Sequence, residues 1–284
     1  MAKIIDGKAI AQEVRNELKG KVADLTHKGI TPGLTVILVG NNPASEVYVR
    51  GKIRACEEVG IRSELISLPA EVSEADLLLK IKELNKDDQV HGILVQLPLP
   101  NHISESNVIE TIAYQKDVDG FHPESVGRMV TGLETFLPCT PHGIMELLSR
   151  TGVDLNGKHA VVVGRSNIVG KPMALLLQQQ NATVTMCHSR TVDLPSFTRQ
   201  ADVLVAAVGK VGLITKEHVK EGAVVIDVAM NRDVEGKLCG DVLFDEVSEV
   251  ASAITPVPGG VGPMTIAMLL KNTVISAERV LQQV

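Results

Sequence analysis

Short apolar runs alternate with helical patterns along the chain, and this alternation restricts the fold more than any other feature of the sequence. In the first half, runs rich in β-branched residues lie at residues 34–40, 61–68 and 91–100. Apolar residues recur at helical spacing over residues 7–25, 43–60 and 73–84. Strands that alternate with helices in this order pair in parallel, because each helix returns the chain to the same end of the sheet. The first half therefore predicts an α/β unit.

A second series of the same kind begins after a loop-rich passage over residues 116–141. Its apolar runs lie at residues 159–164, 182–189, 201–209 and 222–230. We therefore expect an α/β protein with two α/β lobes, joined near the helical stretch of residues 140–152 rather than by a flexible tether. The last residues, from 262 onward, predict a long helix whose packing partner the periodicity does not fix.

Composition narrows the class of partner. The chain has 284 residues, of which 44% are hydrophobic, and this is enough for two domains with their own cores. A net charge of -6 without a dense Lys/Arg run disfavours nucleic acid and anionic membranes as partners. The cysteines stand singly, so we expect free thiols, no structural metal and a cytoplasmic location; they are Cys56, Cys139, Cys187 and Cys239.

The segment from His159 to Pro172 resembles a nucleotide-binding turn with one residue exchanged. Gly164 ends an apolar run and Gly170 opens a helical run, but Ser166 stands where the dinucleotide fingerprint has its middle glycine. A helix that starts behind such a turn points unpaired N–H groups and the positive end of its dipole at a pyrophosphate. A plain structural turn between a strand and a helix is the alternative interpretation.

The end of the next strand bears on which dinucleotide would bind. Nucleotide folds that take NAD usually carry an acid there for the ribose 2′-hydroxyl, whereas an arginine nearby accommodates the 2′-phosphate of NADP. This chain has Ser189 and Arg190 and no carboxylate, which favours NADP over NAD. A solvated polar loop is the alternative interpretation. We take Arg165 and Ser189 as the residues for the 2′-phosphate. Successive residues at a strand end point in opposite directions, so Ser189 and Arg190 should not contact it equally.

Three polar residues of the first series indicate a second site. Tyr48 and Lys52 are four apart on a helical pattern and share one face of it, and Gln96 ends an apolar run. Ligands of open α/β sheets collect beyond the carboxyl ends of the strands, where Gln96 lies if that strand is parallel. The ordinary alternatives are that Lys52 is a surface lysine, that the Tyr48 ring lies at the edge of the core, and that Gln96 is a polar residue that ends a strand.

Seven segments in order connect these features to a known family. They read "YVRGK", "GILVQLPLP", "KDVDGFHP", "PCTPHGIMELL", "GRSNIVGKP", "CHSRT" and "ITPVPGGVGPMTIAML". Over essentially its whole length the chain closely resembles the bifunctional methylenetetrahydrofolate dehydrogenase/methenyltetrahydrofolate cyclohydrolase family. The resemblance implies a catalytic, folate-binding domain over residues 1–138 and a Rossmann-type NADP-binding domain over residues 139–263. It also implies that the C-terminal helix, residues 264–284, returns to the first domain.

The resemblance assigns roles to individual residues. It implies that Lys52 is the main catalytic residue, that Tyr48 positions the substrate and that Gln96 tunes the lysine. It further implies that Asp119 grips the pterin, which suits a carboxylate because it can accept paired hydrogen bonds from a ring N–H and an exocyclic amine. Small residues near the folate and nicotinamide would be Pro258, Gly259 and Gly260, although a helix-entry loop has the same composition.

One segment departs from the family pattern. Where relatives commonly have "GINR", this chain has Ala229 and Met230 before the Asn-Arg pair. Backbone contacts to the nicotinamide would survive unless Ala229 must adopt a positive φ. We therefore keep Met230 as a cofactor contact. The complete cofactor-binding set is then Gly164, Arg165, Ser166, Ser189 and Met230, with no metal.

The implied function is a pair of reactions in one-carbon metabolism. NADP would oxidise 5,10-methylenetetrahydrofolate to the 5,10-methenyl compound, and hydrolysis would give 10-formyltetrahydrofolate. The resemblance also implies a homodimer formed through the nucleotide domain. Two alternatives are a different NADP-linked two-domain dehydrogenase, such as a malic-enzyme-like one, and a pterin or nucleotide sensor that has lost catalysis.

Overall fold

The computed structural model describes residues 1–281, and within them the chain divides into two compact units. The first unit comprises Gln12–Cys139 and residues 266–281, and the second comprises Met1–Ala11 and Thr140–Thr265. Each unit contains its own parallel sheet. The prediction of a two-domain α/β fold is therefore confirmed. The junction between the units falls at the start of helix α6 (Cys139–Arg150), within the predicted helical stretch.

The sheet of the first unit has three strands in the order β3-β2-β4. They are β2 (Gly33–Val39), β3 (Arg62–Leu68) and β4 (Gly92–Val95). Both neighbours pair in parallel with β2, which is buried at every position because it lies in the middle of the sheet. Strands β3 and β4 lie within the apolar runs that the sequence analysis identified, and β2 begins one residue before its run.

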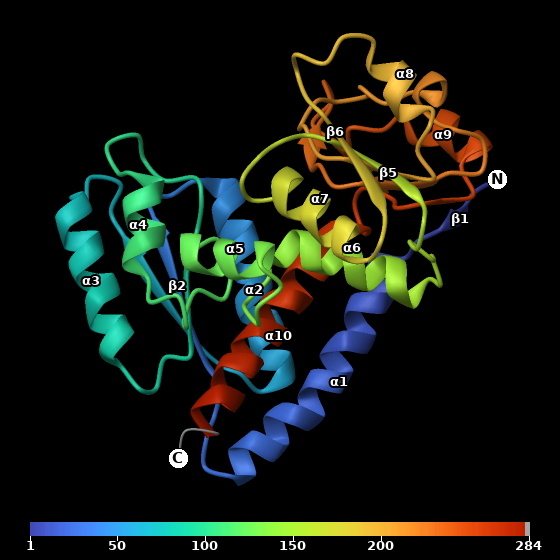
Figure 1. Cartoon of the computed structure of the whole chain (residues 1–284). Coiled ribbons are helices and arrows are strands. Elements are labelled where there is room, and N and C mark those ends of the chain that lie inside the picture. Colours follow the sequence, from blue (N-terminus) through green and yellow to red (C-terminus); the bar gives the residue numbers. More distant parts are fainter. Residues whose placement is uncertain (282–284) are drawn as a thin grey trace. The chain divides into compact units, whose positions relative to one another are not determined.

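Helices cover this sheet and link its strands. They are α1 (Gly7–His27), α2 (Pro43–Val59), α3 (Glu74–Lys86), α4 (Glu105–Thr111) and α5 (Pro123–Val130). In Figure 1, α3 and α4 stand side by side next to β2, and their apolar residues share one core with it, including Ile37, Leu77 and Val108. Ser73 begins α3 as an N-cap whose side chain accepts a hydrogen bond from the Asp76 N–H.

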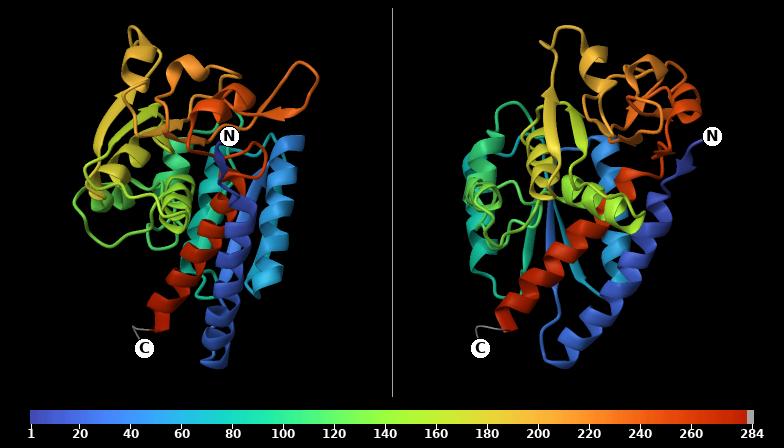
Figure 2. Two further views of the ribbon diagram at one scale, coloured as in Figure 1. Left: turned by 90° about the vertical axis from the view of Figure 1, so that its right-hand side faces the viewer. Right: turned by 45° about the vertical axis from the view of Figure 1, so that its right-hand side comes forward.

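The C-terminal helix α10 (Val261–Leu281) packs in the first unit beside α1 and α2, as Figure 2 shows. Arg15 of α1 forms an ion pair of 3.0 Å with Glu58 of α2, and Ile266 of α10 lies against Gly51 of α2. The predicted return of the C-terminal helix to the first lobe is thus confirmed for residues 266–281. Residues 282–284 lie outside the described residues.

The second unit has a six-stranded sheet in the order β1-β11-β8-β7-β5-β6, with every neighbouring pair parallel. Its longer strands are β5 (His159–Val163), β6 (Thr183–Cys187), β7 (Val203–Ala206) and β8 (Val224–Asp227), all within predicted runs. The chain passes from β5 to β6 on one side and then to β7 on the other. The strand order therefore reverses beside β5, and such a reversal is where open α/β sheets bind ligands.

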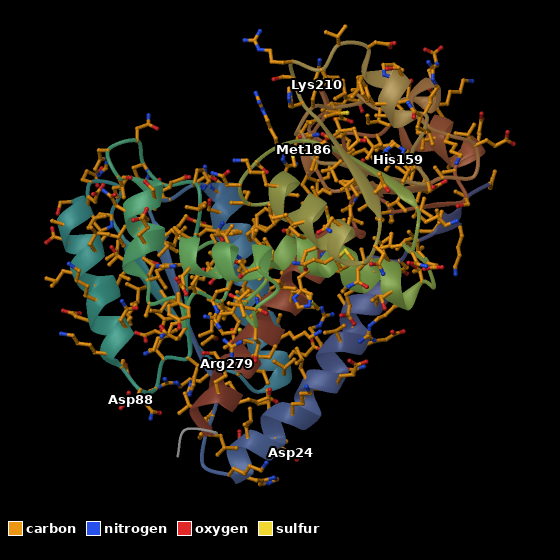
Figure 3. All side chains as sticks on the ribbon, in the orientation of Figure 1. Asp24, Asp88, His159, Met186, Lys210 and Arg279 are labelled. Atoms are coloured by element: carbon orange, nitrogen blue, oxygen red, sulfur yellow. The ribbon has the colours of Figure 1, made fainter. Side chains whose placement is uncertain are left out.

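Shorter elements complete the second unit. They are α7 (Gly170–Gln179), α8 (Leu194–Thr198), the 3-10 helix η1 (Lys216–His218), the β9 (Asn231–Arg232) and β10 (Leu238–Cys239) hairpin, and α9 (Phe244–Val250). Figure 3 labels His159 at the start of β5 and Lys210 beyond the end of β7, which mark opposite ends of the parallel strands. The core includes Val161, Leu204, Val225 and Ile254.

The N-terminal residues belong to the second unit. Strand β1 (Lys3–Ile4) pairs in parallel with β11 (Ala253–Ile254), and the Ile5 N–H donates to the Ile254 carbonyl at 2.8 Å. The sequence analysis grouped residues 1–138 together, because a two-residue strand has no periodicity of its own. Across residues 1–281, none of the helices has the length and apolar character needed to span a bilayer.

Candidate functional site

Lys52 and Gln96 meet in the first unit. Lys52 lies on α2 with only 8% of its surface exposed, and its Nζ donates a 3.1 Å hydrogen bond to Gln96 Oε1. Gln96 directly follows β4, and its N–H donates to the Ile37 carbonyl of β2. The Gln96 Nε2 donates to the Leu97 carbonyl at 2.7 Å, so the amide has its oxygen turned toward the lysine. The structure thus brings together two residues that are 44 positions apart.

Tyr48 lies one helical turn before Lys52 on α2. Its side chain is 39% exposed, which leaves the ring accessible to a ligand. Partial burial raises the pKa of the Tyr48 phenol above its ordinary value, so the hydroxyl keeps its proton at neutral pH. A protonated phenol with an exposed ring can both donate a hydrogen bond and stack on a planar group.

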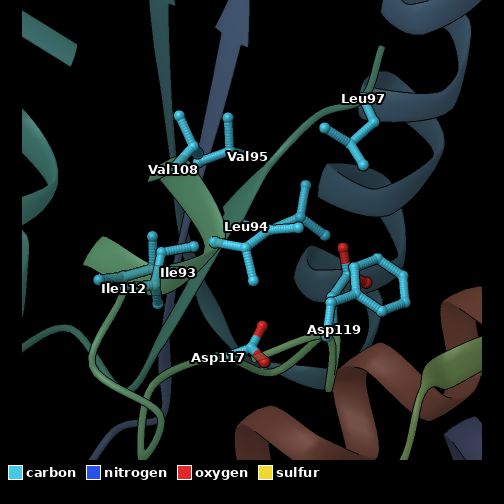
Figure 4. Close-up of a pocket in the computed structure, with 10 residues that line it drawn as sticks. Ile93, Leu94, Val95, Leu97, Val108, Ile112, Asp117 and Asp119 are labelled. Carbon is cyan, nitrogen blue, oxygen red and sulfur yellow. The ribbon is translucent and has the colours of Figure 1, made fainter. Parts of the chain in front are cut away.

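Asp119 lies in the "DVDG" segment, which follows β4 in the chain and also contains Asp117. Both line a small pocket with apolar walls from β4, including Leu94, and Figure 4 shows the two carboxylates on the same stretch of chain. Burial raises the pKa of Asp119, while the positive charge of Lys52 lowers it, so the lysine and this acid interact. The carboxylate of Asp119 therefore belongs to the same electrostatic site as Lys52.

Asp117 is a buried acid beside Asp119 that the sequence analysis did not single out. It is 2% exposed, and its Oδ2 accepts a 2.7 Å hydrogen bond from the His122 N–H. Burial, together with the neighbouring charge of Asp119, raises its pKa to about 7. The "DVDG" motif contained the signal, since its two acids are two apart. Nothing in the sequence indicated that the first would be the more deeply buried.

Hydrogen bonds from two side chains, Asn272 and Cys139, hold the backbone next to Asp119. The side-chain amide of Asn272, on α10, donates to the carbonyls of Val118 at 2.8 Å and Leu137 at 3.2 Å. The thiol of Cys139 donates to the same Val118 carbonyl at 3.2 Å. Burial raises the pKa of Cys139 well above its ordinary value, so it stays a thiol. The C-terminal helix therefore fixes the chain immediately before Asp119.

The glycine turn lies at the carboxyl end of β5 in the second unit. Gly164 has φ +132°, and a Cβ there would clash with the Ala207 carbonyl; a Cβ on Gly170 would clash with the Gly164 carbonyl. Val163 of β5 pairs with Cys187 of β6, so the loops that follow these residues leave the sheet side by side. Both positions therefore need glycine, and a glycine turn of this kind lets a pyrophosphate approach the backbone closely.

Ser166 has a role that differs from our expectation for the helix terminus. We expected unpaired N–H groups at the start of α7, but the Ser166 Oγ accepts from the N–H groups of Val169 at 3.2 Å and Gly170 at 3.3 Å. The Lys171 N–H donates to the Ser166 carbonyl at 3.1 Å. The serine therefore satisfies the N–H groups of the N-cap residue Val169 and of Gly170 from within the turn, and its own hydroxyl hydrogen can still be donated to a ligand.

Arg165 and Ser189 are both exposed in these adjacent loops. The loop after β6 has a defined shape: the His188 N–H donates to Thr191 Oγ1 at 2.9 Å, and the Arg190 N–H donates to His188 Nδ1 at 3.1 Å. These bonds make the segment an ordered turn at the edge of the sheet. Arg165 and Ser189 thus leave neighbouring strand ends with their side chains available.

Met230 and the predicted glycines line one small pocket of the second unit. Its walls come from residues 227–230 and from residues 256–262, which include Pro258, Gly259 and Gly260. The Lys8 N–H donates to the Gly259 carbonyl at 2.9 Å, which ties this loop to the start of α1. Ala229 is not among the residues with positive φ in the described chain, so alanine in place of glycine is compatible with this backbone.

Both units of the chain match the domains of one enzyme family. The model of the tetrahydrofolate dehydrogenase/cyclohydrolase catalytic domain matches residues 5–119, and that of the NAD(P)-binding domain of the same enzymes matches residues 138–281. A Brevibacillus brevis relative named bifunctional protein FolD is 63% identical over 282 residues, covering 99% of each chain.

Two solved structures have the same fold as this chain. The bifunctional enzyme FolD from Campylobacter jejuni, a methylenetetrahydrofolate dehydrogenase/cyclohydrolase, is 54% identical, covers 99% of this chain and 100% of its own, and gives a TM-score of 0.97. FolD from Trypanosoma brucei, solved with NADP and an inhibitor, is 42% identical with a TM-score of 0.95 and 99% coverage of both chains. The chain belongs to the tetrahydrofolate dehydrogenase/cyclohydrolase family.

Proposed function

We propose that the site of Lys52, Gln96 and Asp119 carries out both reactions of this folate enzyme. In the first, 5,10-methylenetetrahydrofolate gives up a hydride and becomes the 5,10-methenyl cation. In the second, water adds to that cation, a carbon–nitrogen bond of the ring opens, and 10-formyltetrahydrofolate and one proton are released. The observation that carries the proposal is the buried Lys52–Gln96 hydrogen bond beside the charge of Asp119.

Lys52 is the group that we assign to proton transfer. A buried amine at the carboxyl end of a parallel strand can take a proton from the attacking water at Nζ and return it to the leaving ring nitrogen. The hydrogen bond to Gln96 Oε1 restricts the direction of the amine, so Gln96 acts as its positioning residue. Tyr48, one turn away on the same helix, is placed to hold the substrate by its ring and hydroxyl.

Asp119 is the residue that we assign to the pterin. A carboxylate accepts two parallel hydrogen bonds from a ring N–H and an exocyclic amino group, which fixes the plane of the heterocycle. The Asn272 and Cys139 hydrogen bonds to Val118 hold the backbone beside it. The acid therefore sets the orientation of the substrate relative to Lys52, and orientation contributes to the rate as well as to affinity.

The second unit fits NADP. Glycines at 164 and 170 permit a tight turn in which side chains would clash with the backbone, and such a turn can present its N–H groups to a pyrophosphate. Arg165 and Ser189 offer donors for a 2′-phosphate from adjacent loops. Met230, Pro258, Gly259 and Gly260 line the pocket that we assign to the nicotinamide half. NADP, when bound, supplies the hydride acceptor. The residues of the chain bind it and exclude water.

The proposal is tested by assaying the purified protein in two ways. Methylenetetrahydrofolate with NADP should give NADPH, and the methenyl compound should be hydrolysed faster than in buffer without any nucleotide present. Activity in both assays is the expected result. A protein that binds NADP and folate but turns over neither compound would instead be the sensor considered above, and oxidation of a hydroxy acid would identify a different dehydrogenase.

We also propose a homodimer through the second unit and a location in the cytoplasm. Strand β6 ends the sheet, and Met186 on it is 36% exposed, which suits pairing with a second copy. The four cysteines are free thiols, three of them buried, as a reducing compartment allows. Sedimentation should give the mass of a dimer, and Met186→Lys should shift it toward the monomer.

A further inference from the structure

A buried acid of the second unit, Asp241, connects loops that lie around the proposed cofactor site. It follows β10 and has no exposed surface. Its carboxylate accepts hydrogen bonds from three successive backbone N–H groups: Val208 at 2.7 Å, Gly209 at 3.1 Å and Lys210 at 2.6 Å. Successive N–H groups that converge in this way compensate a buried negative charge. The loop directly after β7 is therefore wrapped around this one side chain.

The same carboxylate also holds the segment after β8. The side-chain amide of Asn231 donates to Asp241 Oδ1 at 3.0 Å, and Asn231 directly follows Met230, which lines the pocket assigned to the nicotinamide. Asn231 is the asparagine of the "AMNR" segment, in which the preceding two residues depart from the family pattern. Asp241 thus has one set of bonds to the loop after β7 and one bond to the loop after β8.

A second buried acid, Asp227, fixes Asp241 itself. The Asp227 carboxylate accepts from the N–H groups of Asp241 and Val242, both at 3.0 Å. A Cβ on Gly240 would overlap the Asp227 carboxylate, so glycine lets the chain pass directly over it. Burial raises the pKa of Asp227 to about 6, which reflects how completely the pair is removed from water. Three loops therefore meet at two carboxylates.

The position of these loops relates the network to the nucleotide. β5, β7 and β8 are parallel neighbours, so the loops after them leave the same edge of the sheet. Gly164 of the glycine turn packs on the Ala207 carbonyl, directly before the loop that Asp241 holds. Ligands of such sheets bind at this edge. A shift of the loop at residues 207–210 would consequently move a wall of the cofactor site.

We propose that Asp241 is a positioning residue for NADP, which sets the spacing between the loop after β7 and the loop that carries Met230. This inference rests on the proposed function, because the site it supports is the cofactor site described above. Asp241 acts through the Val208–Lys210 backbone and through Asn231, and it need not touch the nucleotide. The cyclohydrolase step needs no nucleotide, so Asp241 should affect the two activities of the chain differently.

The test is Asp241→Asn, which keeps the shape of the side chain but replaces one acceptor oxygen by a donor facing backbone N–H groups. The KM for NADP should rise about tenfold or more, because hydrogen bonds to a charged group are lost and loops separate. The rate of methenyl hydrolysis and the KM for methylenetetrahydrofolate should stay within about twofold of wild type. Glu249→Gln, an exposed acid on α9, is the matched control and should change neither.

Two measurements keep the outcome decisive. NADPH titration of the wild type and Asp241→Asn should show weaker binding in the variant, and an unchanged dissociation constant with an unchanged KM for NADP would overturn the inference. If Asp241→Asn does not fold, Asn231→Ala is the second variant, because it leaves the hydrogen bonds from residues 208–210 intact. It should raise the KM for NADP by a smaller factor and leave the rate of methenyl hydrolysis unchanged. An equal loss of both activities would count against the inference. A wild-type protein without either activity would instead refute the proposed function.

Discussion

The Nζ atom of Lys52 donates a hydrogen bond of 3.1 Å to the amide oxygen of Gln96, across 44 residues of sequence. The lysine comes from a helix and the glutamine from the end of a parallel strand. Since Gln96 Nε2 is engaged by the Leu97 carbonyl, the amide cannot turn over without losing that bond. The pair is thus oriented before any substrate binds.

Lys52→Met should abolish methenyl hydrolysis and strongly reduce the dehydrogenase rate, while NADP binding persists. The methyl thioether fills similar space but cannot carry a proton. Both half-reactions should be assayed on the purified variant, together with NADPH titration and circular dichroism. Lys82→Met, an exposed lysine of α3, is the control and should behave as wild type. Near-normal hydrolysis in Lys52→Met would remove this lysine from the mechanism.

Asp119→Ala should chiefly weaken folate binding. Hydrogen bonds to a charged group contribute about 1.5–3 kcal/mol, so the dissociation constant for the folate should rise about 10- to 100-fold. Calorimetric titration with folate and with NADPH separates the two ligands, and Asp88→Ala on the surface serves as the control. Unchanged folate affinity with disturbed NADPH binding would place Asp119 in another site.

Asp117 should make the free energy of unfolding depend on pH. Its pKa is about 7 in the folded chain, above the ordinary value of 3.8, so between these values the folded state holds a proton that the unfolded state has released. The contribution of this acid to stability therefore falls as pH rises from about 4 to about 7 and is constant above. The asparagine of Asp117→Asn does not titrate, so its contribution to the free energy of unfolding does not change over this pH range.

The check is urea unfolding of wild type and Asp117→Asn at several pH values. The difference in unfolding free energy, variant minus wild type, should increase with pH over that interval, on the order of a few kcal/mol at most. Taking the difference cancels the titrating groups that do not interact with Asp117, whereas Asp119, whose charge raises the pKa of Asp117, contributes to the difference as its partner. A difference that stays constant with pH would show that Asp117 ionises normally in the folded chain.

Arg165→Ala should impair the use of NADP more than the use of NAD. Only NADP carries the dianionic 2′-phosphate that a guanidinium can bind, so its KM should rise about tenfold while that for NAD changes little. The ratio of kcat/KM for the two nucleotides in wild type and variant measures the effect. Arg199→Ala, an exposed arginine after α8, is a control. Equal use of both nucleotides by the wild type would contradict the assignment.

Ser166→Ala should destabilise the second unit by about 1 kcal/mol, since it removes the acceptor for two N–H groups at the start of α7. Thermal unfolding of the variant against Ser196→Ala, whose hydroxyl donates to the Asp193 carbonyl in an exposed turn, checks this value. The KM for NADP should change only modestly, because the freed N–H groups can themselves face a phosphate. A large loss of NADP affinity would mean that the hydroxyl binds the nucleotide directly.

The sequence by itself determined the parts of this protein that have a local signal. The strands from β2 to β8 appear as apolar runs, and glycines mark the tight turn at 164–170. The strand pattern also predicted that Gln96 lies at the carboxyl ends of the parallel strands, whereas its hydrogen bond with Lys52 was decided by the tertiary structure. In each case a few neighbouring residues specify the conformation, so the prediction does not depend on distant partners.

Only the tertiary structure decided the features that join distant segments. Two-residue strands such as β1 and β11 have no periodicity. Strand β1 forms because β11, about 250 positions away, supplies its hydrogen bonds, and β11 in turn pairs with β8. The hydrogen bonds that Ser166 accepts, and the burial of Asp117 and Asp241, likewise have no sequence signal. The residue type of an aspartate is the same whether the side chain is buried or exposed. What distinguishes it is the set of N–H groups that folding brings around it, and these come from loops that meet only in the folded chain.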